Sequence, residues 1–212
     1  MPTSRHVTLF HSSRSRSSGV LALLEELGAD YELHLLDQKK GEQRRAEYLA
    51  VNPMGKVPAI RHGAAIVTEQ VAVYLYLADL YAERGLAPGL DDPLRGPYLR
   101  WIAFYGSSFE PALVDRSMQR EPAPPAMSPY GDYETMLATL VGQLGGGPYI
   151  LGERFSAADV LWGNALRWVT GFGMVEATPV IADYIARVMA RPAEQRAIKA
   201  DEALAAEMGL TG

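Results

Sequence analysis

The stretch NPMGKVPAI, Asn52–Ile60, holds the strongest local signal in the chain, because two prolines flank a Gly-Lys pair just before an apolar run. Proline has no N–H to donate to a sheet, so Pro58 fits the first residue of a strand, a strand edge or a turn. A proline whose peptide bond is cis also reshapes the backbone of the preceding residue, and such prolines usually serve a purpose. We therefore expect a turn that ends in a strand near Pro58.

The segments on both sides of this stretch alternate between strand and helix patterns. Before it come an apolar run, a Ser/Arg-rich turn, a helical pattern that stops at Gly28, a second alternating run and a short polar helix. After it come a hairpin that turns at His62-Gly63 and an amphipathic helix. The order β-α-β-α-β-β-α is predicted for residues 6–11, 19–28, 30–37, 42–52, 57–62, 64–67 and 68–83.

The pattern changes after residue 83. Gly and Pro recur in residues 84–93, which predicts a linker. From residue 94 to 212 the apolar residues have helical spacing, with breaks at 121–129, 145–149 and 191–195. We expect a small α/β domain at 1–83, a linker at 84–93 and an all-α C-terminal domain at 94–212.

Composition excludes several classes of protein. Hydrophobic residues make up 48% of the 212 residues and charged ones 21%, as in ordinary folded proteins. The net charge of −5 and the lack of a long basic run argue against nucleic-acid binding. The chain has no cysteine and four unpaired histidines, so we expect no disulfide and no metal site. We see no signal peptide, and the longest apolar stretch is broken by Asp79, so we expect a cytoplasmic protein without membrane spans.

The β-α-β-α-β-β-α unit with a proline at the start of its third strand resembles the thioredoxin fold. The resemblance implies that the Val57–Pro58 bond is cis and lies opposite the N-terminus of the first helix. It also implies that the main-chain N–H and C=O of Val57 face solvent, where an extended peptide can pair with them as an added strand.

Four segments, in this order and at these separations, resemble the cytosolic glutathione S-transferases: LAVNPMGKVPAI, TEQVAVYLYLAD, RFSAADV and ARPAEQRA. The resemblance covers the chain from about Val7 to Ala197. It implies an enzyme that joins glutathione, as co-substrate, to small hydrophobic electrophiles, and a homodimer. It also implies that Val57 and Pro58 bind glutathione.

The segment RFSAADV also has a local structural meaning. Ser156 fits a helix N-cap, and Asp159 three residues later fits the reciprocal partner of a capping box. This pair is expected to support folding, so we leave it out of the site.

The segment TEQ begins the amphipathic helix at 68–83. Thr68 is predicted as its N-cap, which would place Glu69 and Gln70 in the first turn, where free N–H groups and the helix dipole can hold a carboxylate. The resemblance implies that this turn binds the γ-glutamyl end of glutathione. Gln70 stands where family members normally have serine.

The turn HSSRSRSSG, His11–Gly19, follows the first strand, where thioredoxin-like folds hold their catalytic group. A thiol with a pKa near 8.5 becomes thiolate more readily when a hydroxyl donor, a helix N-terminus and cations surround it. Counting back from Gly28 makes Ser15 the first candidate, and Arg14 and Arg16 are expected to add positive potential. Ser12 and Ser17 remain as alternatives. The resemblance implies that the alpha, mu and pi classes of glutathione S-transferases have their catalytic tyrosine where this chain has His11. Because the chain lacks that tyrosine and has no cysteine, we expect a serine-type enzyme.

Further substrate contacts are predicted on both domains. Lys40, with Lys39 and Gln43 as alternatives, is expected to hold the glycine carboxylate. Tyr105, with Ser108 and Met118, is expected to line the electrophile pocket, whereas Trp101 and Phe104 are expected in the core.

Two other functions stay open from the sequence. The same bound thiolate could serve peroxide reduction, isomerisation or dehalogenation. Alternatively, the chain could be a non-catalytic ligand carrier or interaction module that keeps the fold.

Overall fold

The computed structural model describes residues 5–121 and 123–210. Contacts divide the chain into two compact units. The first takes in the described residues up to Gly85 together with those from Ala190 onward, and the second runs from Leu86 to Met189. Each unit is described on its own.

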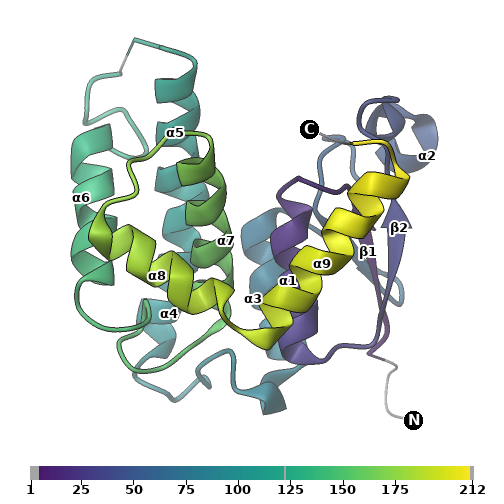
Figure 1. The fold of residues 1–212 in the computed structure, drawn as a ribbon, viewed down its shortest axis with the longest axis horizontal. Helices are drawn as coiled ribbons and strands as arrows, with labels where there is room; N and C mark the ends of the chain where they lie inside the picture. Colours follow the sequence, from purple (N-terminus) through teal and green to yellow (C-terminus); the bar gives the residue numbers. More distant parts are fainter. Residues whose placement is uncertain (1–4, 122, 211–212) are drawn as a thin grey trace. The chain divides into compact units, whose positions relative to one another are not determined.

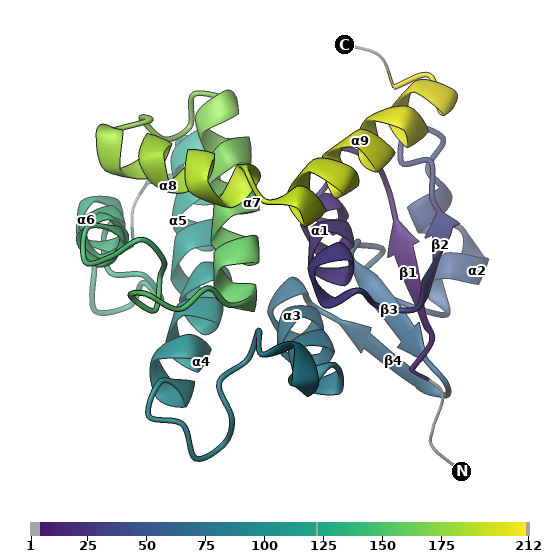
Figure 2. The same ribbon diagram turned by 60° about the horizontal axis from the view of Figure 1, so that its bottom comes forward.

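The first unit is built on a four-stranded mixed sheet; Figure 1 labels its strands β1 and β2, and Figure 2 shows the full order β2-β1-β3-β4. β1 pairs in parallel with β2 and antiparallel with β3, and β3 and β4 form the expected hairpin. This arrangement confirms the thioredoxin-like fold. The strands are β1 (Val7–His11), β2 (Tyr31–Leu35), β3 (Ala59–His62) and β4 (Ala65–Thr68).

Helices cover both faces of this sheet (Figure 2). Alternate residues of a strand point to opposite faces, and in β1 Leu9 and His11 are fully buried towards α1, whereas Phe10 packs on Tyr48 of α2. α9 packs along α1 (Figure 1). The elements are α1 (Ser17–Leu27), η1 (Glu42–Arg44), α2 (Ala46–Leu49), α3 (Gln70–Leu80), η2 (Ala82–Arg84) and α9 (Pro192–Glu207).

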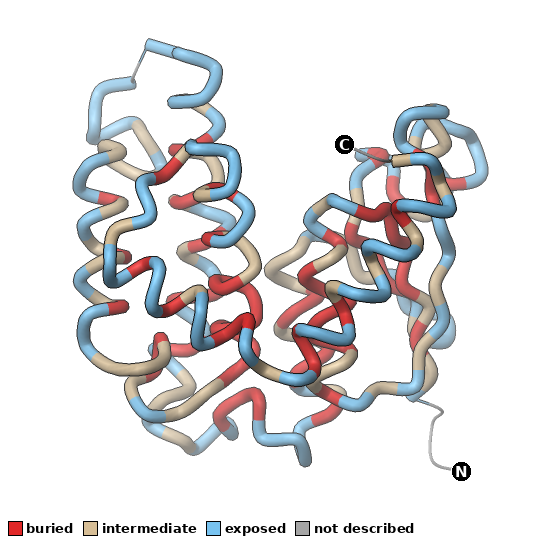
Figure 3. The backbone as a smooth tube through the Cα atoms, viewed as in Figure 1, coloured by how far each residue is buried: buried red, intermediate tan, exposed pale blue. Residues whose placement is uncertain are grey.

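The second unit is helical, and its core contains a cluster of buried aromatic residues. Figure 3 marks the buried stretches of the backbone in red. Trp162 is fully buried and donates a hydrogen bond from Nε1 to the carbonyl of Trp101 at 3.0 Å. The rings of Tyr105 and Phe109 pack against it. The elements are α4 (Arg95–Phe104), η3 (Tyr105–Phe109, a π-helix), α5 (Glu110–Ser117), α6 (Tyr133–Leu144), α7 (Ala157–Gly171) and α8 (Pro179–Met189).

The capping box at the start of α7 is confirmed and extends further than the sequence indicates. The main-chain N–H of Ser156 donates to Asp159 at 2.8 Å, and both residues are fully buried. The same carboxylate also accepts from the N–H of Ile150 at 2.7 Å and the hydroxyl of Tyr184 at 2.8 Å. Burial raises the pKa of Asp159 despite these donors. Asp159 therefore ties the start of α7 to the preceding loop and to α8.

The division into units differs from the expected domain boundaries at two places. α9 was expected within a domain at 94–212, but it belongs by its contacts to the first unit, where it packs on α1. The segment expected as a linker, residues 84–93, already packs against the second unit near its start. Leu86 is buried, and its carbonyl accepts a hydrogen bond from the N–H of Ala157 at 2.9 Å. Helical spacing shows that a segment is a helix, not which body it packs against.

Replacing Asp159 by alanine is expected to lower the free energy of unfolding by about 3 kcal/mol, because several buried donors lose their acceptor. Urea denaturation measures the change. Asp183→Ala, at an exposed position of α8, is the control, with an expected change within about 0.5 kcal/mol. Equal effects of the two substitutions would contradict the structural role of Asp159.

Candidate functional site

Side-chain hydrogen bonds hold the turn that precedes β3. Asn52 is buried; its amide donates to the carbonyl of Lys56 at 2.9 Å and its side-chain oxygen accepts from the N–H of Met54 at 3.0 Å. The hydroxyl of Tyr48 donates to the same Lys56 carbonyl at 2.5 Å. Gly55 has a φ of 59°, and an added Cβ would come within 2.8 Å of the carbonyl oxygen of Gln43. Glycine is therefore required at this position.

The residue at the end of this turn offers free main-chain groups. The Val57–Pro58 peptide bond is cis, as expected from the resemblance. No hydrogen bond within residues 5–121 and 123–210 reaches the main-chain N–H or C=O of Val57. An incoming extended peptide could pair with both groups.

The sheet register brings the ends of the strands to one edge. Phe10 pairs with Ala59, which pairs with Thr68 on its other side. His11, the last residue of β1, pairs with Leu35, the last residue of β2. The predicted residues that flank these strand ends therefore leave the sheet at the same edge: Ser12, Ser15, Ser17, Lys40, Val57, Pro58, Glu69 and Gln70.

The start of α3 differs from the prediction. Thr68 belongs to β4, and Glu69 takes the N-cap position, so the expected N-cap at Thr68 is wrong. Glu69 has φ 66° and ψ 118°, an unfavourable backbone conformation for a residue with a side chain, and such residues cluster at functional sites. The side chain of Glu69 makes no cap hydrogen bond, and within the described residues the N–H groups of Val71 and Ala72 have no hydrogen-bond partner. This turn can accept a carboxylate.

The serines after β1 form one connected network. Ser15 is half-buried, and its hydroxyl lies 2.7 Å from the carbonyl of Ser12 and 2.8 Å from the hydroxyl of Ser17. Ser17 and Ser12 are buried, and the N–H of Ser12 donates to Oγ of Ser17 at 3.1 Å. Of the three predicted serines, Ser15 is the one with an accessible side chain.

Two residues that the sequence did not single out as site residues complete this network. His11 is fully buried, with Nδ1 at 2.8 Å from Oγ of Ser17 and Nε2 at 2.9 Å from Oδ1 of Asp201 in α9. The other carboxylate oxygen of Asp201 accepts from the N–H of Arg14 at 3.2 Å and the hydroxyl of Ser18 at 2.9 Å. Burial would raise the pKa of Asp201, but the hydrogen bonds from His11, Arg14 and Ser18 outweigh it and lower the pKa.

The remaining predicted residues have different environments. The side chains of Arg14 and Arg16 are exposed beside the serines. Lys40 forms an ion pair with Asp37 at 2.9 Å, and its side chain is 71% exposed. Tyr105 lies in the second unit, where it is 4% exposed and donates from its hydroxyl to Glu110 at 2.7 Å. This burial is that of a core residue and leaves Tyr105 little surface for contact with an electrophile.

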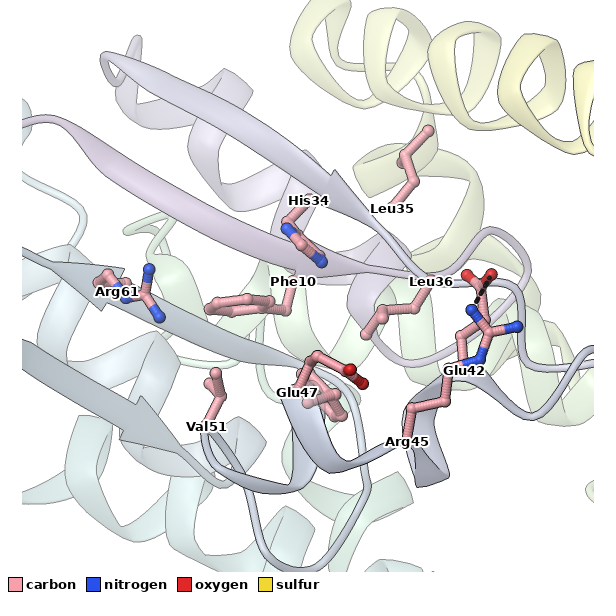
Figure 4. A pocket seen from close by; sticks show the side chains of 10 residues that line it. Phe10, His34, Leu35, Leu36, Glu42, Arg45, Glu47, Val51 and Arg61 are labelled. Atoms are coloured by element: carbon pink, nitrogen blue, oxygen red, sulfur yellow. Dashed lines mark ion pairs between the residues drawn. The ribbon is translucent and has the colours of Figure 1, made fainter.

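A cavity of about 310 Å³ opens between α2 and the sheet (Figure 4). Phe10 and Tyr48 form part of its wall, with Arg61 at one side and the ion pair of Arg45 with Glu42, 3.1 Å, at another. None of the sequence-predicted site residues lines this cavity, so it is separate from the edge that carries the serines.

The described residues also exclude two features. Within them, no group of three or more His, Asp or Glu side chains is placed to hold a metal ion. No helix in this part of the chain combines the length and the apolar character needed to cross a bilayer.

Comparison with known proteins agrees with this geometry. Residues 5–79 match the glutathione S-transferase N-terminal domain and residues 130–187 the glutathione S-transferase C-terminal domain. The chain is 28% identical to glutathione S-transferase GstA of Escherichia coli O157:H7 over 196 residues, which cover 91% of this chain and 98% of that protein.

Solved structures are similar over nearly the whole chain. A glutathione transferase from Methylococcus capsulatus superposes with a TM-score of 0.79 at 30% identity, covering 92% of this chain and 98% of that one. A sphingomonad glutathione S-transferase complexed with glutathione has a TM-score of 0.74 at 31% identity, with the same coverage of 92% and 98%. The protein therefore belongs to the glutathione S-transferase family.

Replacing Asn52 by alanine is expected to lower the free energy of unfolding by about 1–3 kcal/mol, because the buried turn loses two hydrogen bonds. Thermal or urea unfolding measures the loss. Gln38→Ala removes an exposed amide of similar size and serves as the control. A loss for Asn52→Ala no larger than that of this control would show that the side chain does not hold the turn.

Proposed function

We propose that this protein is a glutathione transferase that binds glutathione at the sheet edge of the first unit and stabilises its thiolate for attack on small hydrophobic electrophiles. The observation that carries the proposal is the meeting, at one edge, of three features: the free main-chain groups of Val57, the open first turn of α3, and the serines at the start of α1. Family membership supports glutathione as the co-substrate.

The three features match the chemistry of a tripeptide thiol. The main chain of Val57 can pair with the peptide backbone, and the first turn of α3, beside Glu69 and Gln70, can hold the γ-glutamyl carboxylate. Lys40 remains exposed enough to meet the glycine carboxylate while paired with Asp37. Bound in this way, glutathione would present its sulfur near the turn that contains Ser15.

Ser15 is the proposed thiol-binding residue. It is more accessible than Ser12 and Ser17, and it lies at the N-terminus of α1, where the helix dipole favours an anion. A charge-assisted hydrogen bond contributes about 1.5–3 kcal/mol, enough to lower a thiol pKa by one to two units. Arg14 and Arg16 add positive potential nearby.

We also propose a cytoplasmic homodimer. Membership of the glutathione S-transferase family, which matches over residues 5–79 and 130–187 support, is the basis for both points.

Capture on immobilised glutathione, followed by conjugation of chlorodinitrobenzene, tests the proposed function. We expect retention on the resin, elution by free glutathione and consumption of thiol with the aromatic electrophile. Cumene hydroperoxide replaces the electrophile in a parallel assay of peroxidase activity. Retention without turnover would favour a ligand carrier, and no retention would contradict glutathione binding altogether.

Ser15→Ala is expected to lower kcat/KM about 10- to 100-fold while glutathione is still retained, because one donor to the thiolate is lost. Ser13→Ala is the matched control in the same turn, since the buried hydroxyl of Ser13 has no hydrogen-bond partner in the described structure. Steady-state kinetics of both variants give the comparison. Equal activity of Ser15→Ala and the unaltered protein, or a loss confined to Ser13→Ala, would assign the role elsewhere.

A further inference from the structure

The serines of the turn are connected through His11 to a carboxylate on α9. Hydroxyl oxygens of Ser15 and Ser17 lie 2.8 Å apart, and Ser17 lies 2.8 Å from Nδ1 of His11. Nε2 of His11 lies 2.9 Å from Asp201. The chain of contacts runs from a half-buried hydroxyl to a fully buried imidazole with an anionic partner.

The carboxylate determines which nitrogen of His11 carries the proton. An ionised carboxylate only accepts hydrogen bonds, so Nε2 must donate to Asp201. In the neutral ring Nδ1 is then an acceptor, and Ser17 donates to it. Ser17 is fully buried and cannot itself attack a substrate, which excludes a hydrolytic triad. The imidazole can act only through the serines.

The network has two consistent directions. With neutral His11, Ser17 donates to Nδ1, and Ser15 donates its single proton either to Ser17 or to the carbonyl of Ser12, which lies 2.7 Å away. With protonated His11, each donates outward, from Nδ1 to Ser17, from Ser17 to Ser15, and from Ser15 to an acceptor beyond it, which is the carbonyl of Ser12 at 2.7 Å until a stronger acceptor takes its place. A thiolate is such an acceptor. The outward direction is the one in which Ser15 stabilises sulfur.

We propose that the His11–Asp201 pair accepts the thiol proton of bound glutathione through Ser15 and Ser17; this inference rests on the proposed function. The S–H bond breaks and its proton passes to Oγ of Ser15, which gives its own proton to Ser17, which gives its own to Nδ1 of His11. Sulfur keeps the electron pair as thiolate, both serines end neutral, and the imidazolium pairs with Asp201.

The surroundings of His11 suit this role. α9 contributes Asp201 and α1 contributes Ser17, while β2 ends opposite His11 at the apolar Leu35. The main-chain N–H of Arg14 donates a hydrogen bond to the carboxylate of Asp201, and the side chain of Arg14 is exposed to solvent. Among the described residues, Asp201 is the charged group bonded to the ring, so it is the counter-ion of the imidazolium.

A proton inventory tests the relay in the full chain. Ultraviolet difference absorbance measures the thiolate formed when glutathione binds, and calorimetry in buffers of different ionisation enthalpy measures the protons released. At pH 7.5 we expect well under one proton released per thiolate, because His11 takes up the proton that the sulfur gives. For Ser17→Ala we expect about one proton per thiolate and about tenfold less thiolate, a rise of one unit in the apparent pKa of the thiol.

Two further variants separate the relay from a structural role. Asp201→Asn removes the counter-ion and is expected to move the proton count in the same direction as Ser17→Ala. Arg196→Gln removes another contact of α9 with α1, the 2.8 Å pair with Glu25, and is expected to leave the count unchanged. Loosening of α9 alone would lower thiolate formation in all variants without changing the protons per thiolate.

Each other outcome overturns the relay. One proton released per thiolate by the unaltered protein shows that solvent, not His11, takes the proton. A low count that persists in Ser17→Ala shows that another group takes it. Failure of the unaltered protein to bind glutathione overturns the proposed function and the relay together, and so differs from the first two results.

Discussion

The pairing of β1 with both β2 and β3 is the constraint on which the rest of the first unit depends. It places the end of β1, the start of β3 and the end of β4 at one edge of the sheet. Because successive side chains of β1 point to opposite faces of the sheet, His11 lies on the face that α1 and α9 cover and Phe10 lies on the face that α2 covers. A shift of one residue would exchange these faces, burying Phe10 among the serines and removing His11 from Asp201.

α9 contributes both to stability and to the site. Its N-cap residue Arg191 pairs with Glu26, and within the helix Arg196 pairs with Glu25 and Asp201 with His11. These three contacts join α9 to the rest of the first unit. The Arg196 pair is largely exposed and of a kind that usually contributes little. Arg191 binds the nearly buried carboxylate of Glu26 at two points, 2.6 and 2.8 Å, which is a stronger geometry. The third involves a fully buried ring and is of a different kind.

Local patterns were sufficient for much of the fold. The alternation of strands and helices, the hairpin at His62-Gly63 and the capping box of Ser156 with Asp159 all follow from short-range chemistry, and all were predicted. The start of α3 was missed because the positive φ of Glu69 is imposed by its surroundings and has no signal in the residue type. Asp201 could not be predicted as a partner of His11: the two are 190 residues apart, and a carboxylate on a polar helix normally faces solvent.

The separation of His11 from Asp201 in the sequence affects when the first unit can finish folding during synthesis. During synthesis the strand that bears His11 emerges 190 residues before Asp201, so its buried ring has no carboxylate partner until α9 has been translated. Contacts this distant in sequence form late and slow the search for the native state. The first unit therefore stays incomplete while the helical unit between Leu86 and Met189 is synthesised, and during that time α9 cannot cover the surface of α1. This interval is where a chaperone would be most needed.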